Sequence, residues 1–387
     1  MRHIPFLMTG LLLLLFLGGR AQTTLSGSFS FGGLTRDYRI YVPAAYSGTS
    51  AVPLVFNFHG YTSNAQAQEL YGDFRAIADT ANFLLVHPQG SLINGSTGWN
   101  NFGLPGTAPD DVGFVSALID TLRAQYNIDI QRIYATGLSN GGFMSYDLAC
   151  FLSHRLAAMA SVAGGMVPLH AAACSPQHPM PVMQIHGTTD AVVTYSGTGG
   201  IIGCLHVDSL MQFWVNKNQC NSIPSVTTVP DIVTADLCSA EHHVFSGGQA
   251  GVTVELFKVL NGGHTWPGSV FPVPGNGNTN QDFNASLEIW KFFRRYSLGN
   301  LSTSVTNTPL APEVRIYPNP NSGMIRLTGL RPGLYSFDLF DLHGRKVYSS
   351  SDRDATKPLH LPALSPGLYQ WVIRQSEKVY HGRTQMR

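Results

Sequence analysis

The chain has 387 residues, which suits one large domain followed by a small one. Charged residues make up only 12%, and 24 Lys and Arg against 23 Asp and Glu leave a formal charge of +1. This balance disfavours polyanionic partners, so it excludes nucleic acid and anionic membranes as main ligands. The 44% of apolar residues exclude a disordered chain, and 40 Gly and 23 Pro predict a loop-rich protein.

Residues 1–21 have the form of a secretory signal peptide. Arg2 supplies a positive start, and the apolar run from Leu7 to Leu17 is too short to span a bilayer. Gly19 and Ala21 then occupy positions −3 and −1 of a cleavage site before Gln22. No later stretch is long and apolar enough to cross a membrane, so we expect an exported, soluble protein.

Export makes disulfides possible, and the five cysteines leave at least one unpaired. Cys150 and Cys174 flank one segment, and Cys220 and Cys238 flank another. We predict a bridge within each pair, which leaves Cys204 free, although spacing alone does not determine the pairing.

Strand-like and helix-like runs alternate from residue 25 to about residue 298. The strand-like runs are residues 39–42, 53–58, 83–87, 132–136, 181–185 and 253–259. The helix-like runs are residues 65–80, 112–126, 142–156 and 282–296, and Asp110 and Asp111 stand where the cap of the second belongs. This alternation predicts an α/β fold with a mostly parallel sheet covered on both faces, in which the first strands can be antiparallel.

The composition changes after residue 298. Residues 299–313 are rich in Ser, Thr, Asn and Pro without periodicity, which is typical of a linker. Short β runs separated by turns follow at 314–317, 324–328, 334–339, 346–349, 359–361, 368–374 and 378–380. We therefore predict a signal peptide over 1–21, a main domain over 22–298, a linker, and a small all-β sandwich over 314–387.

The strongest local signal is Gly-Leu-Ser-Asn-Gly at residues 137–141, between a predicted strand and a predicted helix. A G-x-S-x-G motif in this setting is the nucleophile elbow of an α/β-hydrolase, whereas the motif alone is no more than a glycine-rich turn. The elbow exposes the hydroxyl of Ser139 and aims the backbone N–H of Asn140 at an oxyanion. We predict Ser139 as the nucleophile.

A serine needs a base that a third group orients. In this fold the acid and then the histidine follow the serine along the chain, each beyond a strand. Asp190 follows the strand at 181–185, and His264 follows the strand at 253–259 on a loop with Gly262 and Gly263. We therefore predict Asp190 and His264 as the catalytic partners of Ser139.

Other acids and histidines are weaker candidates. Asp208 lies in a helix-like run, and Asp231 and Asp236 lie in a polar insertion, so none of them follows a core strand. His186 leads a turn and is better placed to hydrogen-bond the loop that carries Asp190. The adjacent histidines at 242 and 243 would face opposite sides of a strand.

The second oxyanion donor should come from the loop after an early strand. The strand at 53–58 runs into His59, Gly60, Tyr61 and Thr62. We assign the donor to the backbone N–H of Tyr61 or of Thr62, and we interpret His59 as a brace of the loop.

Two tryptophans are candidates for substrate binding. Trp99 lies in a Gly/Asn/Pro loop and either lines a cleft or packs in the interior, and Trp266 is close to His264. No spacing of the H-E-x-x-H kind suggests a metal, and the glycines at 197, 199 and 200 lack the strand–glycine–helix context of a nucleotide site. We expect no cofactor.

Four stretches together carry a family resemblance: Pro-Asp-Asp-Val-Gly-Phe at 109–114, the elbow at 137–142, His-Gly-Thr-Thr-Asp at 186–190, and Gly-Gly-His-Thr-Trp-Pro-Gly at 262–268. Residues 25–298 thereby resemble the secreted feruloyl esterase and polyhydroxybutyrate depolymerase-like family, which is related to the family-one carbohydrate esterases. The resemblance implies the same triad of Ser139, Asp190 and His264. It also implies hydroxycinnamate or acetate esters of plant polysaccharide, or polyesters, as substrates. The two cysteine pairs also resemble the family pattern, whereas Cys204 does not belong to it.

The tail resembles the C-terminal sorting domain of the type IX secretion route of Bacteroidetes. The resemblance rests on Ile-Tyr-Pro-Asn-Pro at 316–320, Asp-Leu-His-Gly-Arg at 341–345 and Leu-Ser-Pro-Gly-Leu-Tyr at 364–369. A small carbohydrate-binding sandwich would have the same strand count but would explain the first of these blocks less well.

The sequence thus predicts a secreted, monomeric serine esterase that acts on feruloyl or acetyl esters of xylan-type polysaccharide and uses the type IX machinery for export. A polyhydroxybutyrate depolymerase is the alternative. A noncatalytic carbohydrate-binding protein on a hydrolase scaffold is a second alternative.

Overall fold

The computed structural model describes residues 22–101, 109–197, 203–271, 273–301, 314–317, 319, 321–330, 332–341, 345–376 and 378–386. They divide into two compact units, with the boundary between Thr303 and Ser304. The predicted signal peptide and residues 302–313 of the predicted linker lie outside the described residues. The linker prediction begins too early, because α8 (Leu298–Leu301) is helical and Leu301 is buried in the core of the first unit.

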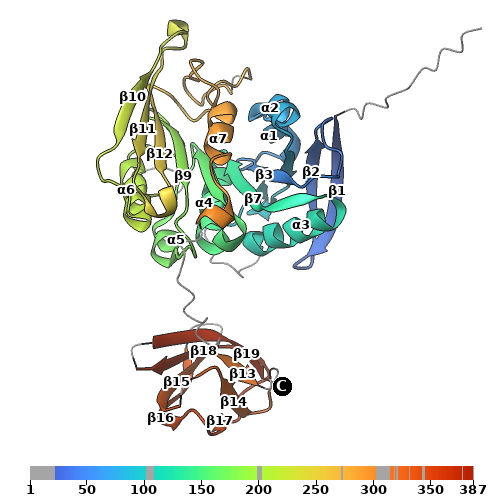
Figure 1. The fold of residues 1–387 in the computed structure, drawn as a ribbon, viewed down its shortest axis with the longest axis vertical. Coiled ribbons are helices and arrows are strands. Elements are labelled where there is room, and N and C mark those ends of the chain that lie inside the picture. The colour runs from blue at the N-terminus through green and yellow to red at the C-terminus, as the bar shows by residue number, and fades with distance from the viewer. Residues whose placement is uncertain are drawn as a thin grey trace, which may run out of the picture. The chain divides into compact units, whose positions relative to one another are not determined.

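The first unit is built on one large sheet (Figure 1). Among the described residues it has ten strands in the order β1-β2-β4-β3-β7-β8-β9-β12-β11-β10. These strands are β1 (Thr23–Phe31), β2 (Leu34–Val42), β3 (Val52–Phe58), β4 (Leu84–Pro88), β7 (Ile128–Gly137), β8 (Ala158–Val162), β9 (Val182–Gly187), β10 (Ser225–Val229), β11 (Ser239–Phe245) and β12 (Val254–Leu260). A separate ribbon pairs β5 (Ser91–Ile93) with β6 (Ser96–Gly98).

The centre of the sheet, from β4 to β12, is parallel, and the strands at both edges are antiparallel. The predicted mostly parallel α/β-hydrolase sheet is therefore confirmed. The strands β1, β8, β10 and β11 were not predicted. Every residue of β8 is buried, and this short apolar run directly follows a helix, so it has no alternation that would separate it from that helix.

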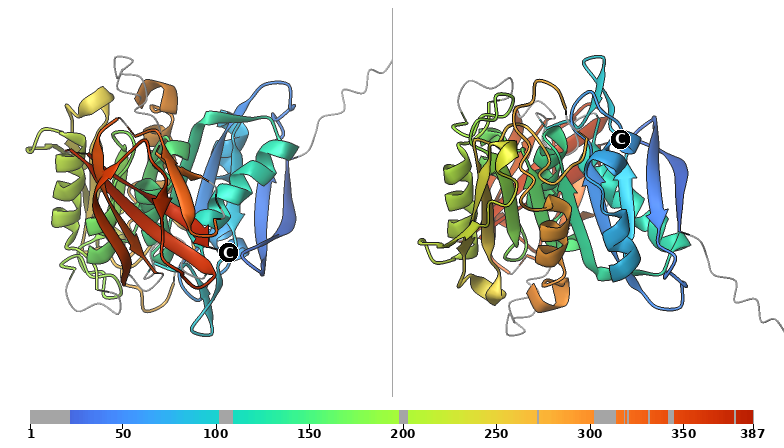
Figure 2. Two further views of the ribbon diagram at one scale, coloured as in Figure 1. Left: turned by 90° about the horizontal axis from the view of Figure 1, so that it is seen from below. Right: turned by 90° about the horizontal axis from the view of Figure 1, so that it is seen from above.

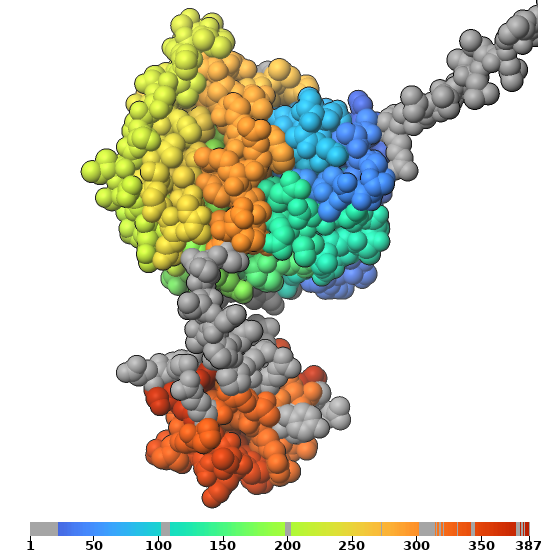
Figure 3. Space-filling model, in the orientation of Figure 1, coloured from blue at the N-terminus to red at the C-terminus, as the bar shows by residue number. Residues whose placement is uncertain are grey.

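Helices cover both faces of the sheet (Figure 2). Their bounds are α1 (Ala65–Tyr71), α2 (Arg75–Ala81), α3 (Asp111–Gln125), α4 (Asn140–Phe151), α5 (Pro168–Ala173), α6 (Val207–Asn218) and α7 (Ala285–Phe293). Phe114 of α3, Leu148 of α4 and Trp214 of α6 belong to one buried cluster. Ala78 of α2 and Trp290 of α7 belong to a second one. On the face seen in Figure 3, the orange surface around α7 lies between the yellow strands and the light-blue surface of α1 and α2.

The helix predicted over 65–80 is two helices. Gly72 ends α1, and its carbonyl accepts a hydrogen bond from Nδ2 of Asn57 at 2.9 Å. A Cβ on Gly72 would lie 3.1 Å from the ring of Trp266, so any larger residue would have to displace the tryptophan slightly. The predicted cap of α3 is confirmed, because Oδ1 of Asp110 accepts from the Gly113 N–H at 2.9 Å.

One of the two predicted disulfides is present. Cys150 at the end of α4 is bonded to Cys174 after α5, and Cys204 is free, as predicted. The predicted bridge between Cys220 and Cys238 is wrong, because both residues are free. The Asn221 N–H bonds the Ser246 carbonyl at one end of β11, whereas Cys238 precedes the other end. The length of this strand, roughly 20 Å, is far beyond the reach of a disulfide.

The second unit is all-β. A sheet of order β13-β14-β17 and a sheet of order β16-β15-β18-β19 are antiparallel. Side chains of both sheets, such as Ile325, Phe337 and Ile373, form one buried cluster, as a sandwich requires. The strands are β13 (Arg315–Tyr317), β14 (Met324–Thr328), β15 (Leu334–Phe340), β16 (Lys346–Asp354), β17 (Leu359–His360), β18 (Gly367–Gln375) and β19 (Lys378–Met386). Over the part of the chain that the structure describes, no helix has the length and apolar character needed to cross a bilayer.

Candidate active site

Ser139 stands on a sharp turn between β7 and α4. Its backbone φ of 54° and ψ of −120° belong to a region that residues other than glycine rarely adopt. A Cβ on Gly141 would collide with the Phe58 carbonyl, and one on Gly137 would lie 2.6 Å from the Gly141 backbone. The Ser139 N–H also bonds the Val162 carbonyl at 2.9 Å. The two glycines of the motif therefore allow the backbone to form the turn, and β8 holds it.

Asp190 and His264 meet at the carboxyl ends of β9 and β12, which are parallel neighbours. Nδ1 of His264 lies 2.8 Å from Oδ2 of Asp190. Oδ1 of Asp190 accepts the N–H groups of Val192 and Val193 at 2.8 and 2.9 Å. Both side chains are buried, so the carboxylate is held in one orientation by its own loop and orients the imidazole.

His186 braces the loop that carries Asp190, as predicted. Its Nε2 donates to the Val193 carbonyl at 2.7 Å, and its Nδ1 accepts from Gln184 at 2.8 Å. Burial lowers the pKa of His186, which favours the neutral ring that this pattern of donor and acceptor requires.

Asn140 is the first residue of α4, and its side chain is used structurally. Its Oδ1 accepts the Trp99 N–H at 2.7 Å, and its Nδ2 donates to the Trp99 carbonyl at 3.1 Å. Asn101 in turn donates to the Asn140 carbonyl at 2.8 Å. This network fixes the start of α4, where the backbone N–H of Asn140 has no partner within the helix.

The loop after β3 offers one of the two predicted second donors. The Thr62 N–H donates to the Thr97 carbonyl at 2.8 Å and is therefore engaged, which leaves the N–H of Tyr61 as the candidate. His59 donates through Nδ1 to the Gly60 carbonyl at 2.7 Å and accepts the Gly90 N–H at Nε2 at 2.9 Å. Burial lowers the pKa of His59 to about 4, so the ring is a neutral brace of this loop.

Ser139 and His264 line one hollow of about 650 Å³, which we call the catalytic hollow. Tyr61, Thr62 and the side chains of α1 form part of its wall, and the remaining lining is largely apolar. Sequence reasoning missed the apolar lining residues Leu70, Tyr71, Val192, Phe271 and Val273. Nothing in a single sequence separates such residues from core residues, although Phe271 and Val273 lie in the same long loop as His264.

The prediction that Trp99 and Trp266 bind substrate is wrong. Each side chain is 1% exposed and neither lines the catalytic hollow. Nε1 of Trp99 donates to the His59 carbonyl at 2.8 Å, so this ring supports the loop of the candidate oxyanion donor. Nε1 of Trp266 donates to Ser286 at 3.1 Å. Its ring packs against Phe74, between α1 and α2, and lines a separate hollow of about 380 Å³.

The described residues contain no group of three or more His, Cys, Asp and Glu side chains that could hold a metal ion. The groups that the structure brings together at this site are a serine hydroxyl, an imidazole and a carboxylate.

Comparison with known proteins identifies the family of this chain. Residues 36–202 match the family model described as esterase PHB depolymerase. A probable feruloyl esterase C of Aspergillus clavatus is 30% identical over 211 residues, which cover 52% of this chain and 68% of the relative. The chain belongs to the esterase PHB depolymerase family. Residues 315–384 match the model of a secretion system C-terminal sorting domain, as the sequence predicts.

The chain spans only part of the length of some of its relatives. The bifunctional acetylxylan esterase/xylanase XynS20E of Neocallimastix patriciarum is 31% identical over 170 residues, which are 44% of this chain but only 24% of that protein. A solved acetyl xylan esterase from Aspergillus awamori has a TM-score of 0.50 at 11% identity and covers 70% of this chain and 99% of its own. This structural likeness supports the fold alone.

Proposed function

We propose that the protein is a secreted serine carboxylic ester hydrolase in which Ser139 is the nucleophile, His264 the base and Asp190 its orienting acid. One observation carries this proposal. Ser139 on its strained turn lines the same hollow as His264, whose Nδ1 is bonded to the buried Asp190.

The reaction would follow from these positions. His264 removes the proton of Ser139 as the hydroxyl attacks the ester carbonyl, and the Asn140 and Tyr61 N–H groups stabilise the oxyanion. His264 then protonates the departing alcohol. Water, activated by the same imidazole, attacks the acyl-enzyme, and the acid leaves with Ser139 regenerated. Each residue acts in both half-reactions, so the chemistry needs no cofactor.

The preferred substrates are feruloyl or acetyl esters on xylan-type plant polysaccharide. The names of the relatives from Aspergillus clavatus and Neocallimastix patriciarum support this class. The apolar lining of the catalytic hollow suits the aromatic ring of a hydroxycinnamoyl group, because burying such a ring stabilises the complex by roughly 25 cal/mol per Å².

A polyester is the alternative substrate, and the exposed apolar side chains of the catalytic hollow favour it. Leu70 is 41% exposed, Phe271 49% and Val273 38%. Clustered apolar groups at a surface are typical of a binding site for an apolar partner. The name of another relative also supports a polyester: the poly(3-hydroxyalkanoate) depolymerase C of Paucimonas lemoignei is 35% identical over 116 residues.

We further propose that residues 1–21 direct export and that the tail delivers a monomeric enzyme to the type IX machinery. The match of residues 315–384 to a sorting domain supports this route. Release into the medium or attachment to the cell surface would follow from processing of the tail.

The central test compares the wild-type chain with Ser139→Ala on methyl ferulate, acetylated xylan and a hydroxybutyrate oligomer. We expect Ser139→Ala to lower kcat by roughly 10⁴-fold or more on the preferred ester. Ester hydrolysis retained by the variant would refute the assignment of Ser139 as the nucleophile. A fluorophosphonate that fails to label Ser139 of the folded chain would favour the noncatalytic carbohydrate-binding protein instead.

A further inference from the structure

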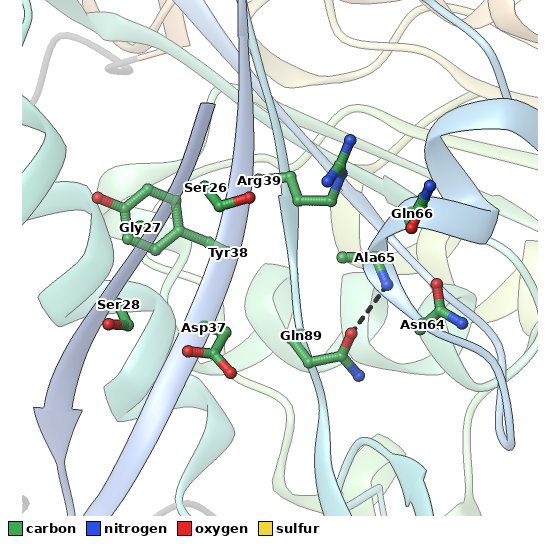
Figure 4. A pocket seen from close by; sticks show the side chains of 10 residues that line it. All are labelled: Ser26, Gly27, Ser28, Asp37, Tyr38, Arg39, Asn64, Ala65, Gln66 and Gln89. Carbon is green, nitrogen blue, oxygen red and sulfur yellow. Dashed lines mark hydrogen bonds between the residues drawn. The ribbon is translucent and has the colours of Figure 1, made fainter. Parts of the chain in front are cut away.

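A second hollow of about 620 Å³ lies beside β1, β2, the end of β4 and the start of α1 (Figure 4). We call it the polar hollow. It shares a wall with the catalytic hollow, because neighbouring residues of segment 60–67 line both. Ser63 and Ala67 line the catalytic hollow, and Asn64 and Gln66 line the polar hollow.

The strand register explains why polar side chains converge here. Ser26 and Ser28 of β1 pair with Arg39 and Asp37 of β2, and paired residues of neighbouring strands project from the same face. Gln89, which directly follows β4, donates its backbone N–H to the Asp37 carbonyl and so lies next to it in the sheet. These five residues therefore lie on one face of the sheet, where they line the polar hollow.

The chemistry of the lining selects a neutral, hydroxyl-rich ligand. The serine hydroxyls and the carboxamide of Gln66 offer both donors and acceptors. The charge of Arg39 is already matched by Glu69, whose Oε2 lies 2.7 Å from its Nε, and Asp37 contributes a carboxylate acceptor. An anionic ligand would meet Asp37, and an apolar ligand would leave the hydroxyls and amides desolvated without partners.

Gln89 also connects the polar hollow to the loop of the candidate oxyanion donor. Its Oε1 accepts the Ala65 N–H at 3.0 Å, as Figure 4 shows. Its Nε2 lies 3.3 Å from Nε2 of His59, the ring that braces Gly60. A ligand in the polar hollow would thus rest against a side chain that supports the catalytic loop.

From this arrangement we propose that the polar hollow binds sugar residues of the polysaccharide whose ester group occupies the catalytic hollow. The inference rests on the proposed function and extends it by assigning a site to the carbohydrate. An apolar hollow for the acyl group and a polar hollow for the sugars then share the wall formed by segment 60–67.

The test measures binding of ester-free xylohexaose to the full chain by titration calorimetry. We expect the wild-type chain to bind and the double variant Asp37→Ala/Gln66→Ala to bind at least tenfold more weakly, because both side chains are exposed and line the hollow. Ser28→Tyr on the exposed edge strand fills the hollow and should give the same loss. Gln212→Ala, on the exposed face of α6, is the matched control and should bind as the wild type does.

Either of two results overturns the proposal: no binding of xylohexaose by the wild-type chain, or equal affinity in the wild type and the double variant. A thermal melt of each variant establishes that it is folded. Because this ligand carries no ester, the binding result is independent of hydrolysis. A chain that binds xylohexaose but hydrolyses no ester would refute the proposed function and leave the carbohydrate site standing.

A second readout uses turnover. The ratio of kcat/KM for a feruloylated xylo-oligosaccharide to kcat/KM for methyl ferulate should fall about tenfold in Asp37→Ala/Gln66→Ala. An unchanged ratio would contradict the proposal, because the sugar residues would then contribute nothing through the polar hollow.

Discussion

Nδ1 of His264 lies 2.8 Å from the carboxylate of Asp190, although the two residues are 74 positions apart in the chain. A carboxylate at this distance accepts a hydrogen bond from Nδ1–H, which keeps the proton on Nδ1 and leaves Nε2 free to act as the base. The carboxylate keeps its orientation because two N–H groups of its own loop bind its other oxygen.

Asp190→Asn should therefore impair catalysis without unfolding the chain. The amide can donate to Nδ1 and stabilise the wrong tautomer, so we expect kcat to fall by roughly 10³- to 10⁴-fold with a small change in KM. Steady-state kinetics on methyl ferulate measure both quantities. Asp231→Asn, in the exposed insertion, is the control, and a similar loss in both variants would contradict the assignment.

The Trp99 indole supports the loop of Tyr61 through the His59 carbonyl. Trp99→Phe leaves that buried carbonyl without its donor, which should lower the free energy of unfolding by about 1–3 kcal/mol and lower kcat about tenfold. Trp214→Phe is a matched control, because the buried Nε1 of Trp214 has no hydrogen-bond partner among the described residues. Equal effects on kcat in the two variants would rule out a positioning role for Trp99.

Some residues of the candidate site can be placed together from the sequence for physical reasons, and the structure does bring them together. A strained turn requires glycines at fixed offsets from Ser139, and parallel strands bring their following loops to one edge, so Ser139, Asp190 and His264 can be predicted from position alone. Trp99 and Trp266 could not be assigned in this way. A tryptophan close to a catalytic residue in sequence can face the core or the solvent, and only the packing of α1, α2 and the loops decides which.

The two predicted cysteine pairs also show that sequence spacing predicts a contact only where the packing brings the residues together. Cys150 lies in the last turn of α4 and Cys174 directly follows α5, and these two helices pack together, so short spacing and spatial contact agree. Cys220 precedes β10 and Cys238 directly precedes β11, and neither strand of this hairpin was predicted. Because the two strands are antiparallel, the cysteines lie at opposite ends of this hairpin.

Thiol titration of the denatured, unreduced chain should find three free thiols, since five cysteines less the two of one bridge leave three. A single free thiol would mean that Cys220 and Cys238 are bonded. Cys150→Ser/Cys174→Ser should lose about 3 kcal/mol of the free energy of unfolding, because it opens a loop with a sequence separation of 24. Cys220→Ser is the control for a change of side chain without loss of a bridge.

Phe271 belongs to the exposed apolar lining of the catalytic hollow. Phe271→Ala should raise KM for methyl ferulate about five- to tenfold and hardly change KM for an acetyl ester, because only the larger acyl group buries area against the ring. Val270→Ala is the matched control, since this neighbouring side chain is 80% exposed and does not line the catalytic hollow. Equal changes for both esters in Phe271→Ala would show that the ring does not contact the acyl group.

Two buried histidines should make the first unit sensitive to acid. Burial lowers the pKa of His59 and of His87 to about 4, whereas an unfolded histidine has a pKa near 6.5. Below about pH 6.5 the unfolded chain therefore binds protons that the folded chain does not, so stability falls as the pH drops from about 6.5 to about 4, by up to roughly 3 kcal/mol for each ring. Asp147, whose pKa burial raises to about 6, acts in the opposite direction over this range.

His87→Met isolates one of these contributions. Glu69 and Asp73 favour the charged form of His87 and Arg39 and Arg75 oppose it, but its burial is the largest influence on its pKa. Urea unfolding at pH 7.5 and pH 4.5 should show that the wild type loses about 2–3 kcal/mol more than His87→Met between the two conditions. Equal losses would mean that the ring of residue 87 is protonated in the folded chain, with Glu69 as the largest source of compensating charge.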